Sequence, residues 1–398
     1  MAKLIGNAPN QVPTNADLGS MAFEDRTNYI TKGASVYQPY RNLIINGDMS
    51  IAQRGTSASG ITTGGTGTVH SVDRMALAIS GAGTWTVSQE TDVPSGQGFA
   101  KSLKFLCTTN QPSIGAGGYI TFLQKFEGQN LQYLKYGTSN AENLTLSFWI
   151  KSSKTGNFIV ELADRDNVKF NARLVSINSA NTWEKKTVTF QGNTTNSFNN
   201  DNNWSMDLQI WFGTGTSFSS GTLQNTWQAT QANRAAGLNL QLQDTTNANV
   251  YLTGVQLEAG KTASDFEFLP FDVNLQRCRR YFESNFVIGT SPAEGRFHTL
   301  AMTYSGLQAF AVNAARVMHF YKATKRATPT LTFYNVTGLG SGTSSGRWQI
   351  YDGGWSQATN PTVAGESRLD QISIQVEDSF SVGTSYLVGG GFKADAEL

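Results

Sequence analysis

The chain has 398 residues, which is enough for two or three domains that each bury a hydrophobic core. Its 30 Lys and Arg residues balance 29 Asp and Glu residues, so the net charge of +1 argues against a nucleic-acid partner. Only 15% of the residues are charged and 40 are glycine, a composition typical of many short strands joined by tight turns.

The first segment, residues 1–41, has turn signals at Pro9 and Pro13 and too few apolar side chains for a core of its own. It is either a disordered tail or an extended arm that packs on another surface. Four apolar side chains favour the arm and are its candidate docking residues, namely Leu18, Met21, Phe23 and Tyr29. We therefore predict an N-terminal docking arm over residues 1–41.

Residues 42–270 follow the two-residue period of half-buried strands. In the segment 144–151, the apolar face holds Leu144, Leu146, Phe148 and Ile150. The pattern recurs in SLKFLC, YITFLQKF, NFIVELAD, WEKKTVTFQG, MDLQIWFG, LNLQLQD and VYLTGVQLE. No long helical pattern separates these segments, which argues against a parallel sheet because parallel strands need crossover helices. The sequence therefore predicts a β-sandwich of the jelly-roll type over residues 42–270.

The predicted sandwich opens at NLIINGDMS, residues 42–50. Leu43 and Ile45 alternate with Ile44, which predicts a buried opening strand. The run NGD at residues 46–48 supplies turn-forming residues that would end this strand.

The period becomes helical in PFDVNLQRCRRYFES. Leu275, Cys278 and Phe282 share one face at i, i+3 and i+7, with the arginines on the opposite face. Asp272 can accept hydrogen bonds from the free N–H groups of a first turn. We therefore predict a short linking helix within residues 271–284.

Residues 285–398 return to strand patterns, as in QISIQVE, where Ile372, Ile374 and Val376 face one way. A second, smaller antiparallel β domain is predicted there. The expected fold class is all-β, with an N-terminal extended arm, a jelly-roll sandwich, a short linking helix and the second β domain.

Sequence motifs for catalysis are weak. The run GTSSG matches GxSxG around Ser344, but no helix pattern follows it, as a nucleophile elbow requires. Asp164 and Asp166 match two positions of an EF-hand-like loop, but Lys169 stands where that loop needs glycine. A charged hairpin tip is the better interpretation of this segment, and we expect no enzyme activity.

Two further absences bear on the class of protein. The three histidines lie far apart and in no metal-binding spacing, and Cys107 and Cys278 are separated enough to predict two buried free thiols. No apolar run is long enough to cross a bilayer, so we expect no membrane insertion.

Tryptophan offers the remaining candidate chemistry. An indole ring can stack on a sugar ring while neighbouring amides and carboxylates bond the hydroxyl groups. Trp149 lies on the face opposite Leu146 and Phe148, and Trp204 lies in the polar run FNNDNNWSMD. These two are the candidate glycan-stacking residues, and most other tryptophans of the large β domain are expected in its core.

Five segments stand in an order and spacing shared with a known module. They are NLIINGDMSIAQRG, VDRM, FEGQNLQYLKYGTSNAENLTLSFWIKSS, NTWEKKTVTF and VYLTGVQLEAGKTASDFEFLPFDVNLQRCRRYFES. Across residues 42–284 they resemble a module of bacteriophage tail-fibre-like and other virion structural proteins. The part up to VQLE is also similar to jelly-roll carbohydrate-binding modules, whose first strand reads NLxxNG. Residues 5–24 resemble N-terminal peptides of phage structural proteins, especially those of marine phages.

The resemblance implies a structural component of a phage virion, namely a tail fibre or fibre-like appendage protein. Its arm would dock on other virion proteins of the tail, the portal-proximal region or the capsid. The chain would form a homo-oligomer, with a trimer favoured, on the particle exterior after synthesis in the host cytoplasm. Several copies would together attach to a host-surface polysaccharide.

The sugar-binding family often carries a structural calcium ion near its first strand. Asp48 matches the first ligand position, but Thr253 and Gly254 stand where an acid of the last strand is expected. Calcium at Asp48 is the one cofactor that the resemblance raises.

Two other functions stay open at this stage. The chain could be a capsid or tail decoration protein without glycan binding. It could also be a polysaccharide depolymerase or esterase, although no pair of positioned carboxylates is evident in the sequence.

Overall fold

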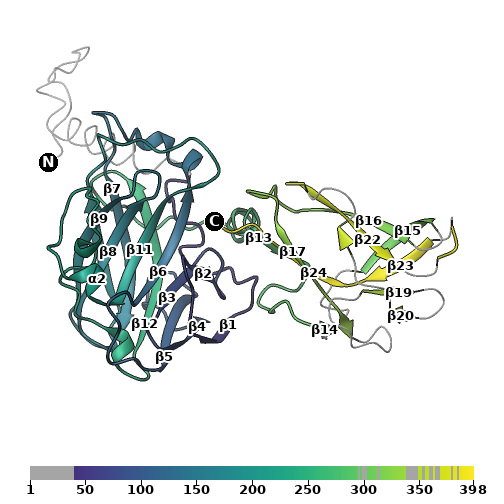
Figure 1. The fold of residues 1–398 in the computed structure, drawn as a ribbon, viewed down its shortest axis with the longest axis horizontal. Coiled ribbons are helices and arrows are strands. Elements are labelled where there is room, and N and C mark those ends of the chain that lie inside the picture. The colour runs from purple at the N-terminus through teal and green to yellow at the C-terminus, as the bar shows by residue number, and fades with distance from the viewer. Residues whose placement is uncertain are drawn as a thin grey trace, which may run out of the picture.

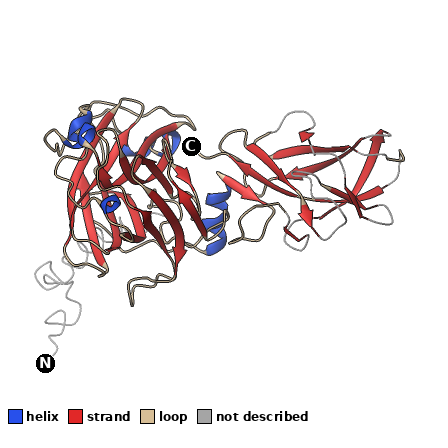
Figure 2. Cartoon of the chain, turned by 60° about the horizontal axis from the view of Figure 1, so that its bottom comes forward, coloured by secondary structure: helices blue, strands red, loops and turns tan. Residues whose placement is uncertain are grey.

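The computed structural model describes residues 40–294, 296–297, 303–311, 314–337, 348–351, 355–357, 362–363, 368–377, 380–382 and 385–398. These residues form two β-rich parts joined by a short helix (Figure 1, Figure 2). The predicted all-β fold class is confirmed. Some predicted residues lie outside the described ranges, namely Leu18, Met21, Phe23, Tyr29 and Ser344.

The larger part is a sandwich of two antiparallel sheets, each with six strands among the described residues. Sheet A has the order β1 (Ser57–Ile61), β4 (Thr84–Glu90), β5 (Ser102–Thr109), β12 (Asn249–Ala259), β7 (Leu144–Ser152) and β10 (Glu184–Phe190). Sheet B has the order β2 (Thr68–Val69), β3 (Ala76–Ser80), β6 (Tyr119–Glu127), β11 (Trp204–Thr214), β8 (Gly156–Asp164) and β9 (Lys169–Ile177).

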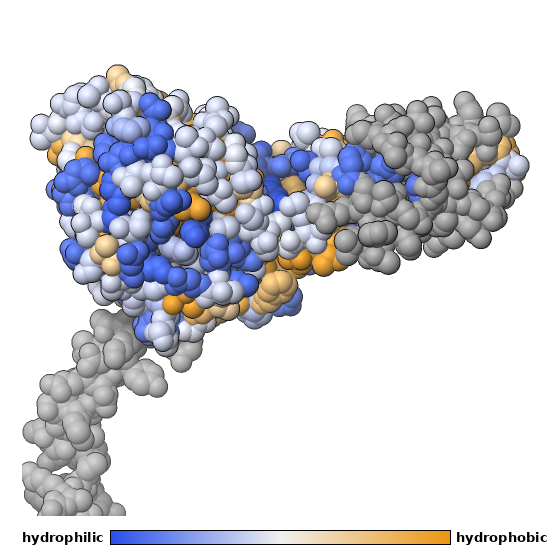
Figure 3. Space-filling view, turned by 90° about the horizontal axis from the view of Figure 1, so that it is seen from below, coloured by the Kyte–Doolittle hydropathy of each residue, from blue (hydrophilic) through white to orange (hydrophobic). Residues whose placement is uncertain are grey.

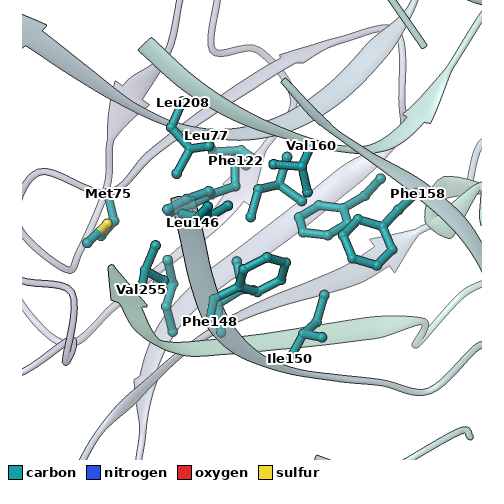
Figure 4. Close-up of a cluster of buried hydrophobic side chains, with 14 of the residues drawn as sticks. Met75, Leu77, Phe122, Leu146, Phe148, Ile150, Phe158, Val160, Leu208 and Val255 are labelled. Atoms are coloured by element: carbon teal, nitrogen blue, oxygen red, sulfur yellow. The ribbon is translucent and has the colours of Figure 1, made fainter. Parts of the chain in front are cut away.

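The core lies between the two sheets and follows from the alternation of apolar residues. Phe148 of sheet A meets Phe158 of sheet B edge to face, with ring centroids 6.3 Å apart (Figure 4). Both side chains are fully buried, as are Phe122 and Leu208. Burying one such side chain stabilises the fold by about 1.5–3 kcal/mol. The face of the larger part seen in Figure 3 is mainly hydrophilic, with scattered apolar residues.

The opening segment confirms the predicted turn at residues 46–48 but not the predicted strand before it, because residues 42–45 form no strand. Asn46 adopts a left-handed backbone with φ of 65°, which breaks the strand pleat. Its side chain donates to the carbonyls of Ile51 and Asp73, both at 2.9 Å. Ile44 is buried in the main core, and Leu43 packs against that core too instead of facing away.

The predicted strand LNLQLQD is also wrong. Gln241 has φ of 42° and precedes a short 3-10 helix, η4 (Leu242–Asp244). The Gln241 side chain accepts a hydrogen bond from Thr214 N at 3.1 Å and donates one to Thr214 O at 3.0 Å. A side-chain amide thus takes the place that a neighbouring strand would occupy beside β11.

The linking helix is shorter than predicted. α3 spans Phe271–Arg279 and ends before Phe282, which lies in strand β13 (Phe282–Ser284). Leu275 and Cys278 are buried as expected. Pro270 is the N-cap, and no side-chain hydrogen bond within the described residues caps the helix, so the capping role of Asp272 is wrong.

The helical pattern predicted that the arginines of this region lie on the side opposite the core. In the structure, two of them contact the sandwich. Arg277 donates to the carbonyl of Asn42 at 3.2 Å, and Arg280 forms two hydrogen bonds with the buried carboxylate of Glu127 at 2.8 and 2.7 Å. These contacts hold α3 and its exit against the sandwich. The other short helices are α2 (Thr216–Ser219), η1 (Gly128–Asn130), η2 (Gln132–Leu134) and η3 (Gln231–Asn233).

The smaller part is also built of sheets. One has the order β13, β24 (Gly391–Asp395) and β17 (Thr330–Tyr334). A larger one has the order β20 (Trp355–Gln357), β19 (Gln349–Tyr351), β23 (Ser385–Gly389), β15 (Thr303–Ala311), β16 (Ala314–Phe320), β22 (Gln371–Glu377) and β21 (Thr362–Val363). One pair departs from the antiparallel prediction, the parallel β14 (Arg296–Phe297) and β18 (Val336–Thr337). The four domain ranges assigned from the sequence, residues 1–41, 42–270, 271–284 and 285–398, stay predictions.

Two further predictions concern the cysteines and membrane-spanning segments. Cys107 and Cys278 are buried free thiols, as predicted. In the described part of the chain, no helix is long and apolar enough to cross a membrane.

Gly47 tests how the opening turn is fixed to the last strand of the sandwich. Its carbonyl accepts a hydrogen bond from Val255 N at 2.9 Å, and a Cβ at Gly47 would lie 2.1 Å from Val255 O. Gly47→Ala should therefore lower the free energy of unfolding by about 1–3 kcal/mol, measured by urea denaturation. Gly117→Ala is the matched control, because nothing lies within 4 Å of its added methyl group. Equal stability of the two variants would contradict this account.

Candidate functional site

The two tryptophans predicted to stack on glycans lie on opposite faces of the sandwich. Trp149 is half-buried on the outer face of sheet A, where it pairs across the sheet with Lys185 and Thr253. Trp204 is half-buried at the start of β11 in sheet B, rather than in a loop. The structure therefore does not bring the two residues into one site.

Trp204 lines a cleft of about 180 Å³ on the outer face of sheet B. The floor comes from outward side chains of β3, β6 and β11, because the alternate side chains of these strands fill the core. Around it stand the 64–67 loop, α2, the turn after η3 and the β8–β9 hairpin. The cleft is lined by Gly65, Thr66, Ala78, Tyr119, Thr121, Leu123, Arg165, Trp204, Gln209, Trp211, Phe218 and Arg234.

Three aromatic rings pack together at one side of this cleft. Trp211 lies 5.3 Å from Phe218 and 6.3 Å from Tyr119, measured between ring centroids. Tyr119 meets Phe218 edge to face at 5.8 Å, and its hydroxyl donates to Gly65 O at 3.0 Å. The cluster fixes the 64–67 loop and α2 against the sheet, so the aromatic wall is formed before any ligand arrives.

Buried charge pairs hold the polar side chains of the cleft. Arg234 binds the carboxylate of Glu161 through Nε at 3.0 Å and Nη2 at 2.7 Å, and the Glu161 side chain is fully buried. The Arg234 guanidinium also lies 4.9 Å from the centre of the Trp211 ring. Burial raises the pKa of Glu161 despite the attraction of Arg234. Each of the two buried charges is therefore stabilised by the other, and removing one would leave the other buried and unpaired.

A second pair orients Trp204. Asp207 is fully buried and accepts hydrogen bonds from Arg165 Nε at 2.5 Å and from Trp204 Nε1 at 2.8 Å. The Arg165 guanidinium lies 4.7 Å from the centre of the Trp204 ring, within cation–π distance. Gln209 joins the two pairs, since it donates to Asp207 at 2.7 Å and accepts from Arg234 at 3.4 Å.

One donor in the cleft wall is unused. Trp211 is 2% exposed, and within the described residues its Nε1 has no hydrogen-bond partner. A buried indole N–H usually finds an acceptor. The atom is therefore a candidate donor to a ligand that enters the cleft.

The sequence-based search missed most of this site. Trp211 was expected in the core, yet strand alternation places it opposite Ile210, on the outer face. That alternation could have identified Trp211 and Gln209. No local signal identifies Arg234, because its partner Glu161 is 73 residues away in the sequence.

The predicted calcium position is occupied by protein hydrogen bonds. Asp48 Oδ1 accepts from Ser50 Oγ at 3.0 Å and from Asn274 Nδ2 at 3.1 Å, so its carboxylate ties the opening turn to α3. Burial raises the pKa of Asp48. Among the described residues, no cluster of three or more His, Cys, Asp or Glu side chains could hold a metal ion.

The segment that contains Asp164 and Asp166 is the tip of the hairpin between β8 and β9, as predicted. Asp164 accepts hydrogen bonds from the backbone and side chain of Asn167 at 3.0 and 3.1 Å. These contacts close the turn.

No protein-family profile matches the sequence. No curated protein matches it either.

Solved structures with similarity to the chain include a phage protein and sugar-binding modules. The enzymatically active domain of tailspike protein 4 from bacteriophage CBA120 is 14% identical over 56% of this chain, with a TM-score of 0.29, and the match spans 22% of that chain. A CBM4 structure is 14% identical over 54% of this chain and 97% of its own, with a TM-score of 0.28. The CBM22-1 xylan-binding domain of Paenibacillus barcinonensis Xyn10C is 13% identical over 53% of this chain and all of its own, with a TM-score of 0.23.

Arg234→Met tests the buried charge pair under the cleft. The substitution leaves the Glu161 carboxylate buried without its guanidinium, which should lower the free energy of unfolding by about 3–5 kcal/mol at neutral pH. The pKa of Glu161 should rise further, so the folded variant binds a proton more readily than the unfolded chain. The loss relative to wild type should therefore shrink as the pH falls through that raised pKa.

Chemical denaturation at several pH values measures this difference. The double variant Glu161→Gln with Arg234→Met is the control, and it should recover stability at neutral pH. A loss in Arg234→Met that is independent of pH would contradict the electrostatic explanation.

Proposed function

We propose that this chain is a non-enzymatic, glycan-binding component of a bacteriophage virion, of the tail-fibre or fibre-like appendage kind. The observation that carries the glycan part is the cleft on sheet B. It combines aromatic rings with guanidinium and amide groups that are held in place before binding, which is the composition of a sugar site.

The groups that line the cleft suit an uncharged sugar, because both arginines of the lining are already paired with carboxylates. Trp204 and Tyr119 are half-buried, so each presents part of its ring to a sugar, and Arg165 and Lys125 pack over the rest of the Trp204 ring. Trp211 Nε1 offers a donor, and Gln209 and Arg234 offer polar atoms for hydroxyl groups. The cleft is small, so single-site binding is weak, and several copies on one particle would supply avidity.

The carboxylates near the cleft favour binding over hydrolysis. Glycoside hydrolysis uses two carboxyl groups that reach the scissile bond. Glu161 and Asp207 are both fully buried and bound by arginines, and neither is among the described residues that line the cleft. In this arrangement they serve as counter-ions for Arg234 and Arg165.

The virion part of the proposal rests on the sequence resemblance over residues 42–284 and on that of residues 5–24. In it, the arm binds other virion proteins and the chain assembles as a trimer on the particle exterior. Light scattering of the purified protein tests the assembly, with an expected mass of three times the 43.1 kDa chain. A stable monomer that is also missing from purified virions would overturn this part.

Trp204→Ala tests the sugar site. Glycan-array screening identifies a ligand, and titration calorimetry with that ligand should show a loss of affinity of roughly tenfold, or about 1.4 kcal/mol, because a stacking face is removed. Trp149→Ala, on the opposite sheet, should bind like wild type. The glycan site would be wrong if Trp204→Ala kept full affinity while folding normally, and loss in Trp149→Ala alone would move it to sheet A.

A further inference from the structure

A second groove lies where the opening segment, the η1–η2 loop and α3 meet. Its volume is about 470 Å³, within the usual range of ligand pockets. Among the described residues, it shares no lining residue with the cleft on sheet B. The groove and the cleft are therefore two separate sites.

The charged lining of the groove is positive. It contains Lys125, Arg277 and Arg280 against one carboxylate, that of Glu127. Glu127 is already bound by Arg280 through two hydrogen bonds and by the hydroxyl of Tyr281 at 2.5 Å. Since Glu127 and Arg280 neutralise each other, the charges of Lys125 and Arg277 remain.

Lys125 is already engaged by other groups. Its Nζ donates to Leu398 O at 2.5 Å and lies 4.2 Å from the centre of the Trp204 ring. Burial lowers its pKa to about 8, so it stays mostly protonated at neutral pH, but its ammonium group is already used by these two contacts. The cation that remains available to a ligand is therefore Arg277.

Among the described residues, Arg277 forms no ion pair within 4 Å, and the nearby Glu267 carboxylate attracts it only from a greater distance. Within the described residues, its guanidinium donates to the backbone carbonyl of Asn42, and its buried Nη1 has no hydrogen-bond partner. By contrast, the carboxylates of Glu161, Asp207 and Glu127 each accept hydrogen bonds from an arginine. Burial lowers the pKa of Arg277 by more than the nearby Glu267 carboxylate raises it. A carboxylate in the groove would supply the missing charge and fit the planar guanidinium.

The rest of the groove suits a sugar more than an inorganic anion. Tyr40 and Tyr133 line it with side chains that are 58% and 45% exposed, so two phenol rings offer faces for stacking. Gln129 and Asn130 are exposed and carry amides that can bond hydroxyl groups. We propose that this groove binds an acidic sugar, a hexuronic acid unit, whose carboxylate pairs with Arg277 and whose ring stacks on Tyr133 or Tyr40.

Titration calorimetry of the full chain with trigalacturonate tests the proposal, and the fully methyl-esterified trimer is the matched ligand. The ester has the same sugar ring without its charge, so it should bind roughly tenfold more weakly or not at all. Affinity for trigalacturonate should fall as salt is added, because the pairing is electrostatic. Equal binding of the acid and the ester would overturn the proposal.

Variants locate the site. Arg277→Gln should weaken trigalacturonate binding roughly tenfold or more, and Arg277→Lys should weaken it less, because the charge remains while the planar geometry is lost. Arg279→Gln is the matched control, since Arg279 lies on the same helix and outside the described lining of the groove. Tyr133→Ala changes an exposed residue and should also weaken binding, so the test does not depend on correct folding of the Arg277 variants.

The same variants distinguish a wrong assignment of the groove from a wrong assignment of the cleft on sheet B. Trp204→Ala should leave trigalacturonate binding unchanged. If Trp204→Ala abolishes that binding and Arg277→Gln does not, the acidic sugar sits in the cleft and the groove assignment is wrong. Inorganic phosphate that competes as strongly as trigalacturonate would overturn the sugar assignment, because the groove would then bind anions in general.

Discussion

A charge taken out of water must meet an opposite charge, and this constraint shapes the binding face of the molecule. On the outer face of sheet B, the fully buried Glu161 and Asp207 are bound by Arg234 and Arg165. These guanidinium groups lie against indole rings of the cleft. The same pairing that makes buried carboxylates tolerable therefore fixes the side chains a sugar would meet.

The same constraint joins the two parts of the chain. Arg74 of the sandwich binds Glu397, and Arg54 reaches both Glu397 and Asp395 at 3.3 and 3.4 Å. The last residues thus return to the sandwich, beside the linking helix (Figure 1). Beside the junction, the buried Lys325 of the smaller part donates to Arg279 O of α3 at 2.6 Å and binds the buried Glu283 of β13 at 2.7 Å. The smaller part is consequently attached by specific charge pairs as well as by the chain connection.

Side-chain amides do the corresponding work at irregular places in the sandwich. Asn42 accepts hydrogen bonds from Ile44 N and Leu257 N, and so links the opening segment to β12. Asn46 and Gln241 satisfy backbone groups where the chain leaves the strand conformation. Both segments had apolar alternation that predicted a strand. The alternation was present, but a side-chain amide bonded the backbone groups that a neighbouring strand would have bonded.

The local pattern of the sequence by itself determined the all-β class, most of the long strands and the helix near Leu275 and Cys278. Alternation and helical period act between near neighbours, so these features need no knowledge of the rest of the chain. Strand alternation placed Trp149 away from the core, and the polar run around Trp204 did the same for that residue. Only the tertiary structure decided that they stand on opposite sheets, and that Arg234 meets Glu161 beside Trp211. Those outcomes depend on strand order and on charge pairing between distant residues, which no local period encodes.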